Sequence, residues 1–235
     1  MIELVGISVE RGGRRVIDAI DLRIPPARWF GVIGANGSGK TSLLRALGGR
    51  LAFAGGECRI EGEACAHDRH ARATRFGFAP PPERLPEAIR VRDILALVGG
   101  DVDGARERGG AIFAALGVEP LLDRWIGDCS AGMRQRVAIA LAFAEGRRAV
   151  ILDEPFNWLD PVAAYDLRMA LRGAVAGGLT LITALHDLGT LASACDEGVM
   201  LANGRVAMRL DGAAMAEAAR DPQGFERRTI DLLRE

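Results

Sequence analysis

The chain has 235 residues with 30 basic and 31 acidic side chains, so its formal net charge at pH 7 is −1. This balance argues against nucleic acid as a partner and against direct attraction to an anionic membrane, because both favour an excess of positive charge. The longest apolar run, 137–144, is too short to span a bilayer, and the first residues lack the features of a signal peptide. A cytoplasmic protein is therefore expected.

Alternating apolar and polar residues over 2–9 and 16–24, on either side of a glycine pair, predict a β-hairpin at the start of the chain. The dipeptide Asn203-Gly204 predicts a second hairpin near the end. Further strands are expected at 29–33, 58–60, 75–78, 149–152, 179–183, 198–201 and 205–210. Apolar residues at helical spacing predict helices within 91–122, 133–144 and 161–175.

The segment Gly34-Ala35-Asn36-Gly37-Ser38-Gly39-Lys40-Thr41 matches every fixed position of the phosphate-binding pattern G-x-x-x-x-G-K-[ST]. It lies between an expected strand and an expected helix, where backbone N–H groups and a helix N-terminus can surround an anion. Lys40 is the only lysine among the 30 basic residues, so an ammonium is kept where it should reach the β- and γ-phosphates. The expected phosphate-binding residues are Gly34, Asn36, Gly37, Ser38, Gly39, Lys40, Thr41 and Ser42.

Two carboxylates follow the apolar run 149–152 and complete a nucleotide site. A carboxylate at the carboxyl end of a buried strand can hold Mg²⁺ through water, and we expect this of Asp153, with the Thr41 hydroxyl as a direct ligand. The next carboxylate can orient and deprotonate an attacking water, so Glu154 is the expected general base.

With its phosphate-binding segment followed by Asp153 and Glu154, the chain resembles the nucleotide-binding subunits of ATP-binding cassette (ABC) transporters over nearly its full length. Residues 129–140 resemble the family signature and its following helix, Asn157-Trp158-Leu159-Asp160 resembles the D-loop, and His186 resembles the switch histidine. The resemblance implies an α/β phosphate-loop ATPase with a mixed central sheet, an N-terminal antiparallel β subdomain and an inserted helical subdomain. It assigns 1–78 and 145–210 to the core, about 79–144 to the helical subdomain and 211–235 to a tail.

The resemblance also implies a mechanism. Two cassettes, expected to be identical, would meet head to tail, with Ser130 and Gly132 of each closing on the ATP and Mg²⁺ held by the other. His186 would contact the γ-phosphate as a second catalytic residue, and Asp160 would lie at the interface and cap a helix. Hydrolysis would drive separate transmembrane permease subunits, which would keep the chain at the inner face of the cell membrane.

Three departures from the family pattern affect these expectations. Cys129, Ala131 and Met133 replace the Leu, Gly and Gln of the signature. Arg11 stands where the family stacks an aromatic ring on adenine; a guanidinium can also stack on a base, and a solvated hairpin arginine is the alternative. Pro81 stands at the Q-loop glutamine, so its side chain cannot bind Mg²⁺, and Glu83 is a candidate substitute.

Two other functions remain open. One is a soluble ATPase of the same fold, such as the iron–sulfur assembly type, and the other is a nucleotide-binding module that hydrolyses weakly because of Pro81. The presence of Glu154 and His186 favours hydrolysis. Trp158 fits either a core or an interface position.

The cysteines form no C-x-x-C pair, which predicts reduced thiols. Four residues could hold a metal or form only a polar hairpin loop: Cys58, Cys65, His67 and His70.

Overall fold

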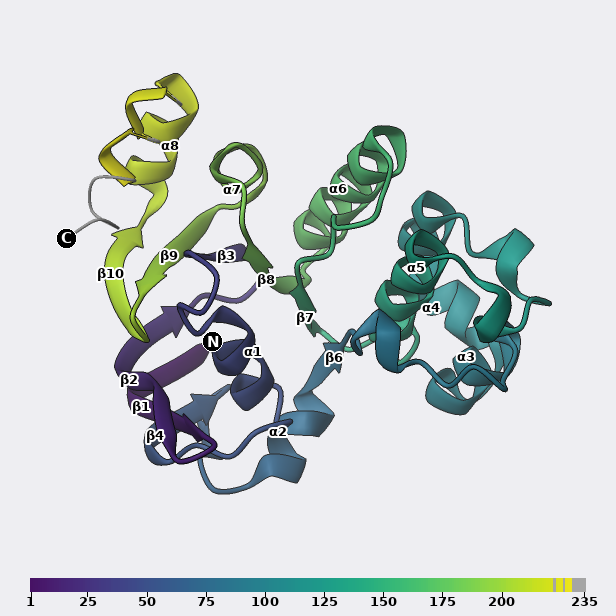
Figure 1. The fold of residues 1–235 in the computed structure, drawn as a ribbon, viewed down its shortest axis with the longest axis horizontal. Helices are drawn as coiled ribbons and strands as arrows, with labels where there is room; N and C mark the ends of the chain where they lie inside the picture. Colours follow the sequence, from purple (N-terminus) through teal and green to yellow (C-terminus); the bar gives the residue numbers. More distant parts are fainter. Residues whose placement is uncertain (222, 226, 230–235) are drawn as a thin grey trace. The chain divides into compact units, whose positions relative to one another are not determined.

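The computed structural model describes residues 1–221, 223–225 and 227–229, which belong to two compact units (Figure 1). The first unit combines Met1–Arg75 with Thr180–Glu235, and the second is Phe76–Leu179. The tail expected over 211–235 begins with helix α8 (Gly212–Arg220). Residues 222, 226 and 230–235 of that tail lie outside the described part of the chain.

An antiparallel sheet opens the first unit and has the strand order β2-β1-β4-β5. Its strands are β1 (Ile2–Arg11), β2 (Arg14–Ile24), β4 (Gly55–Ile60) and β5 (Glu63–Ala64). The predicted first hairpin is confirmed, with Ile2 opposite Ile24 and Leu4 opposite Leu22. These side chains are buried and alternate along each strand with more exposed ones, which is the pattern of a sheet that covers a core on one face.

The second sheet of this unit is mixed and carries the strand order β10-β9-β3-β8. Its strands are β3 (Trp29–Ile33), β8 (Thr180–Leu185), β9 (Glu197–Ala202) and β10 (Arg205–Leu210). Strand β3 runs parallel to both β8 and β9 and is buried at every residue, which explains its continuous apolar sequence. Asn203 and Gly204 both have positive φ, as the predicted tight turn between β9 and β10 requires.

Three helices of the first unit are α1 (Lys40–Leu47), α2 (Arg69–Arg75) and α7 (Leu188–Ala194). Helix α1 follows β3 and contacts β8, and α7 contacts β3. The phosphate-binding segment is therefore the connection from the buried strand β3 to α1, as the sequence motif predicts.

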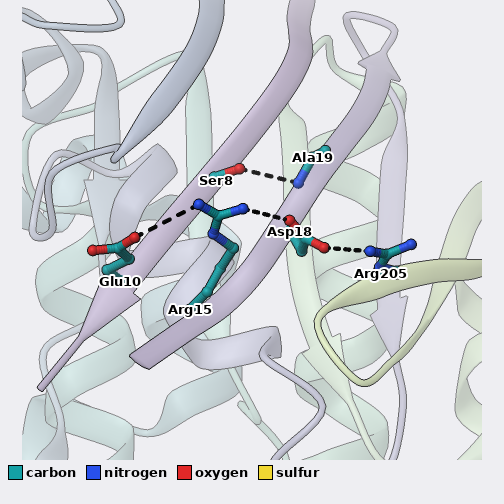
Figure 2. A network of polar contacts seen from close by, with 6 residues as sticks. All are labelled: Ser8, Glu10, Arg15, Asp18, Ala19 and Arg205. Carbon is teal, nitrogen blue, oxygen red and sulfur yellow. Dashed lines mark hydrogen bonds and ion pairs between the residues drawn. The ribbon is translucent and has the colours of Figure 1, made fainter. Parts of the chain in front are cut away.

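Charged side chains connect the two sheets of this unit, as Figure 2 shows. Asp18 on β2 accepts a hydrogen bond from Arg15 at 3.1 Å and forms an ion pair with Arg205 on β10 at 2.6 Å. The two guanidinium groups hold the pKa of the Asp18 carboxyl below its ordinary value. Strands that are distant in sequence are thus bridged at their exposed edges.

The second unit contains a parallel strand pair and most of the helices. Its elements are β6 (Phe76–Phe78), η1 (Pro82–Arg84), α3 (Val91–Gly99), α4 (Val102–Leu116), η2 (Glu119–Leu121), η3 (Ile126–Asp128), α5 (Ala131–Phe143), β7 (Ala149–Asp153) and α6 (Pro161–Ala176). Helices α3, α4 and α5 contact one another, and α4 also contacts α6. The helices predicted from apolar spacing are confirmed. Within the described residues, no helix is long and apolar enough to cross a membrane.

Candidate active site

The phosphate-binding loop of the first unit depends on glycine at Gly39. This residue directly precedes α1, and its φ of 106° is a backbone conformation that residues with a Cβ rarely adopt. A Cβ at this position would lie 2.7 Å from the carbonyl oxygen of Val16 and 2.6 Å from a methyl group of Ile17. The loop can therefore bend closely over β2 only because this position carries no side chain. The first N–H groups of α1 follow this loop directly, and the first N–H groups of a helix have no partner within it.

Lys40 and Ser38 supply polar groups inside this loop. The Lys40 ammonium donates hydrogen bonds to the carbonyl oxygens of Gly34 at 2.7 Å and Ala35 at 3.2 Å, and only 5% of the residue is exposed. The hydroxyl oxygen of Ser38 is buried and has no hydrogen-bond partner within the described residues. Leaving a buried hydroxyl unpaired costs about 1–3 kcal/mol, and a phosphate oxygen would satisfy it. The loop therefore fits a phosphate group.

In the second unit, Glu154 follows the buried strand β7 and is held in an unusual conformation. Its φ is 50°, which is uncommon for a residue other than glycine. The side-chain amide of Asn157 donates to Glu154 Oε2 at 2.7 Å. The side-chain amide of Gln135 on α5 donates to the carbonyl oxygens of Pro155 at 3.2 Å and Glu154 at 3.4 Å. The carboxylate and its backbone are thus fixed by two different segments.

The sequence did not predict that Gln135 and Asn157 support Glu154. Gln135 is 5% exposed although it carries a polar side chain, and a polar residue on the apolar face of a predicted helix is the signal that could have identified it. Asn157 lies in the D-loop segment, but its bond to Glu154 depends on the tight turn after β7, which periodicity does not reveal.

Helix α5 starts at the predicted signature. Ser130 is its N-cap, and the Ser130 hydroxyl accepts a hydrogen bond from the backbone N–H of Met133 at 3.3 Å. Ser130 and Ala131 are exposed, so the N-terminus of the helix faces solvent in this unit. A helix N-terminus of this kind favours an anion.

Comparisons with known proteins agree with this geometry. Residues 17–157 match the family model described as ABC transporter. The hemin import ATP-binding protein HmuV of Pseudomonas fluorescens is 34% identical over 87% of this chain and 84% of its own length. The aliphatic sulfonates import ATP-binding protein SsuB 1 of Mesorhizobium japonicum is 32% identical over 88% and 77%. The chain belongs to the ABC transporter family. It is a single ATP-binding cassette of that family, whose ATP-binding subunits are ATPases.

Solved structures of ABC cassettes share the fold. A structure of the ATP-binding subunit of an ABC transporter superposes with a TM-score of 0.84, at 24% identity and 99% coverage of both chains. A dimeric cassette bound to ADP and phosphate has a TM-score of 0.80, at 19% identity, covering 90% of this chain and 99% of that one. The predicted fold class, an α/β cassette with a mixed sheet and an antiparallel sheet, is confirmed.

In this ABC cassette, the D-loop segment ends on a well-formed helix cap. The Asp160 carboxylate accepts hydrogen bonds from the N–H groups of Val162 at 3.1 Å and Ala163 at 2.9 Å, and from the Arg136 guanidinium at 3.1 Å. The Ala163 N–H is the main reason that the pKa of Asp160 lies below its ordinary value, and Arg136 acts in the same direction. Asp160 is therefore the helix cap that the sequence predicts. Trp158 is 72% exposed, which rejects the core alternative for this residue.

The remaining predicted residues are exposed or partly buried in their units. His186 is exposed directly after β8, and Arg11 is exposed at the end of β1. Pro81 is partly buried with φ −57° and ψ 127°, and it precedes the short helix η1, in which Glu83 is exposed. The functions assigned to these residues stay predictions.

Of the two alternatives for the hairpin, a metal site or a polar loop, the metal site receives no support. Within the described residues, no group of three or more His, Cys, Asp and Glu side chains is arranged to hold a metal ion. His67 and His70 are exposed, whereas Cys58 and Cys65 are buried. All four cysteines are free thiols, as predicted.

The close contact of Gly132 with another loop of the same subunit predicts that a larger residue here lowers stability. A Cβ at this position would lie 2.7 Å from the carbonyl oxygen of Trp158. We expect Gly132→Ala to push this loop away from α5 and to lower the free energy of unfolding by about 1–3 kcal/mol, as overpacking does. The measurement is the melting temperature of the full chain.

Gly173→Ala is the matched control for this prediction. Gly173 lies in α6, and nothing described lies within 4 Å of a Cβ built there. Alanine should therefore stabilise this helix by about 0.5–1 kcal/mol. A Gly132→Ala protein as stable as the Gly173→Ala protein would show that the contact with Trp158 is unimportant.

Proposed function

We propose that this chain is the ATP-hydrolysing subunit of a membrane ABC transporter, and that it acts as a head-to-tail pair of cassettes. The observation that carries this proposal is a phosphate loop with a buried lysine and an unsatisfied buried hydroxyl, in a chain of the ABC family. Hydrolysis of ATP, rather than binding alone, is supported by the fixed carboxylate of Glu154.

Each site residue receives one role in this proposal. The loop residues from Gly34 to Ser42 bind the phosphates of ATP, and Lys40 carries the compensating charge. Glu154 takes the proton of the attacking water on Oε1, since Asn157 already holds Oε2. Asn157 and Gln135 are positioning residues for Glu154. His186 contacts the γ-phosphate.

We propose that Mg²⁺ binds together with ATP and that Thr41 and Asp153 are the protein groups that hold it. Thr41 offers a hydroxyl in the first turn of α1, and Asp153 offers a carboxylate at the end of β7. Hydroxyl, carboxylate, phosphate and water oxygens are the ligands that Mg²⁺ prefers. When bound, the ion neutralises charge on the phosphate oxygens. Pro81 adds no side-chain ligand, which Mg²⁺ tolerates because it commonly keeps several waters.

Separate permease subunits complete the proposed assembly. The relatives named for hemin import and aliphatic sulfonates import are ATP-binding proteins, which favours a role in import for this chain. Their cargoes differ, so we assign the choice of substrate to the permease. Residues 79–144 are the segment that we propose to contact it, which would hold the cassette at the inner face of the membrane. Isolation of the chain without any membrane subunit, from cells that express the neighbouring genes, would favour the iron–sulfur assembly alternative.

Ser130→Arg tests the head-to-tail pair. The new side chain would occupy the space where the γ-phosphate held by the partner cassette must lie. We expect the variant to bind ATP with normal affinity but to lose both hydrolysis and the ATP-dependent dimer. The dimer is measured by light scattering with ATP, in a background in which Glu154→Gln prevents its hydrolysis.

Asp101→Arg is the matched control for this experiment. Asp101 caps α4 in the same unit by accepting a hydrogen bond from the Gly104 N–H at 2.6 Å, so its replacement also removes a cap and adds an arginine. Asp101 lies outside the proposed contact between the two cassettes, so the Asp101→Arg protein should still form the ATP-dependent dimer. An unaltered dimer in the Ser130→Arg protein would reject the head-to-tail arrangement.

A further inference from the structure

Two cysteines face each other at the edge of the antiparallel sheet in the first unit. Strands β4 and β5 pair Arg59 with Ala64 and Ile60 with Glu63, and the next step of this register places Cys58 opposite Cys65. The Cys65 N–H donates to the Cys58 carbonyl at 2.8 Å, and the two Sγ atoms are 3.5 Å apart. Residues opposite each other in antiparallel strands have Cα atoms about 4.5–5.5 Å apart, which is within the range that a disulfide spans.

A buried arginine lies against this pair. Arg72 of α2 is 0% exposed, and its guanidinium donates to the Cys65 carbonyl at 2.7 Å and the Ala46 carbonyl at 3.0 Å, as well as to the carbonyl of Ala66. Its position is therefore fixed by backbone carbonyls of α1 and of the segment after β5. A fixed cation beside a thiol stabilises the thiolate, which is the reactive form.

We propose that Cys58 and Cys65 are an oxidisable thiol pair, which a peroxide converts into a disulfide that links β4 to the segment after β5. The nucleotide chemistry does not use either residue. A disulfide in a protein expected in a reducing compartment is commonly transient and serves in redox sensing, and this pair fits such a modification site.

The two thiols differ in acidity, and this difference assigns their roles. A hydrogen bond from Cys58 lowers the pKa of Cys65 to about 7, and Arg72 and Arg75 act in the same direction, while burial opposes them. The same contact, together with burial, raises the pKa of Cys58. Cys65 is therefore the thiolate that reacts first, and Cys58 is the thiol that resolves the product.

The reaction proceeds in two balanced steps. The Cys65 thiolate attacks one oxygen of hydrogen peroxide, the O–O bond breaks, and the products are a sulfenic acid on Cys65 and hydroxide. The Cys58 sulfur then attacks Sγ of Cys65, forms the S–S bond and releases water, which carries away the Cys58 proton. Peroxide is reduced, and two thiols are oxidised to one disulfide.

Cys129 provides an internal control of matched burial. Both Cys65 and Cys129 are 6% exposed. Cys129 donates to the Trp125 carbonyl at 3.5 Å, and burial raises the pKa of Cys129. If exposure alone set the reactivity, Cys65 and Cys129 would react with peroxide at similar rates.

The test uses the full reduced chain, treated with hydrogen peroxide, quenched by alkylation and digested with trypsin. Arg59 lies between the two cysteines, so a disulfide appears as peptide 51–59 joined to peptide 60–69, with two hydrogens fewer than the separate peptides. We expect this linked species to dominate, to come from monomeric protein on a non-reducing gel, and to disappear with dithiothreitol. Oxidation of Cys129 as fast as Cys65, without the linked peptide, would overturn the proposal.

Two further readouts separate the roles of the thiols. Cys58→Ser should leave a sulfenic acid on Cys65 that dimedone traps, whereas Cys65→Ser should leave Cys58 reduced. In the unmodified chain, the alkylation rate of Cys65 should be half-maximal at a lower pH than that of Cys129, because the pKa of Cys65 is lowered and that of Cys129 is raised. Identical pH profiles for the two cysteines would contradict the assignment.

Discussion

Lys40→Ala will weaken ATP binding by about 10²-fold or more. The substitution removes the ammonium that is expected to contact two phosphates, and a hydrogen bond to a charged group is worth about 1.5–3 kcal/mol. It also removes the hydrogen bonds that hold the carbonyls of Gly34 and Ala35, so the loop loses its internal support. The measurement is titration of the full chain with ATP by calorimetry, with circular dichroism to verify that the variant is folded.

Lys40→Arg is the informative companion variant. It keeps the charge but replaces a compact ammonium, which is 5% exposed, with a planar guanidinium. We expect it to recover little of the lost affinity. Normal binding and hydrolysis by the arginine variant would show that charge alone matters, and that the close surroundings of Lys40 do not select an ammonium.

Glu154→Gln will leave ATP binding intact and lower the rate of hydrolysis by about 10²–10⁴-fold, which is the usual contribution of a general base. Glutamine has nearly the same shape, and its side-chain oxygen can still accept the hydrogen bond from Asn157. The positive φ of the residue is a backbone property that the substitution does not relieve. A loss of rate would therefore report the chemistry of the carboxylate rather than a disrupted turn.

The accompanying measurements are phosphate release and light scattering in the presence of ATP. Because the γ-phosphate persists, the variant should accumulate as an ATP-bound dimer. A Glu154→Gln protein that hydrolyses ATP at the normal rate would remove Glu154 from the mechanism. Asn157→Ala should give a smaller loss of rate, since it frees the carboxylate without removing it.

The sequence was sufficient for features that follow from local pattern. Alternation predicted the first hairpin, the continuous apolar run predicted the buried strand β7, and the dipeptide Asn203-Gly204 predicted the turn between β9 and β10. The phosphate loop and the cap at Asp160 followed from motifs whose geometry is set by neighbouring residues. These features need no knowledge of which distant segments meet.

Other features depend on tertiary contacts and could not be read from the chain. Helix α2 was not predicted, because it is polar and its single buried side chain, Arg72, is charged. The support of Glu154 by Gln135 requires α5 to pack beside the end of β7. The facing cysteines required the register of β4 and β5, without which Cys58 and Cys65 suggested a metal site with two histidines.

Gly132 shows how one residue can satisfy two constraints. The sequence resemblance assigned it to the ATP of a partner cassette, whereas the structure adds a close approach to the Trp158 carbonyl within one subunit. The two explanations are separable, because the intramolecular contact affects stability and the proposed partner contact affects the dimer.

The most direct test of the ATPase assignment is release of phosphate from ATP by the purified chain. We predict turnover that saturates with ATP, requires Mg²⁺ and falls by about 10²–10⁴-fold in the Glu154→Gln protein. A chain that binds ATP but releases no phosphate above background, at any concentration of Mg²⁺ and with its permease present, would contradict hydrolysis. It would instead identify a nucleotide-binding module in which Pro81 stands in place of the Q-loop glutamine.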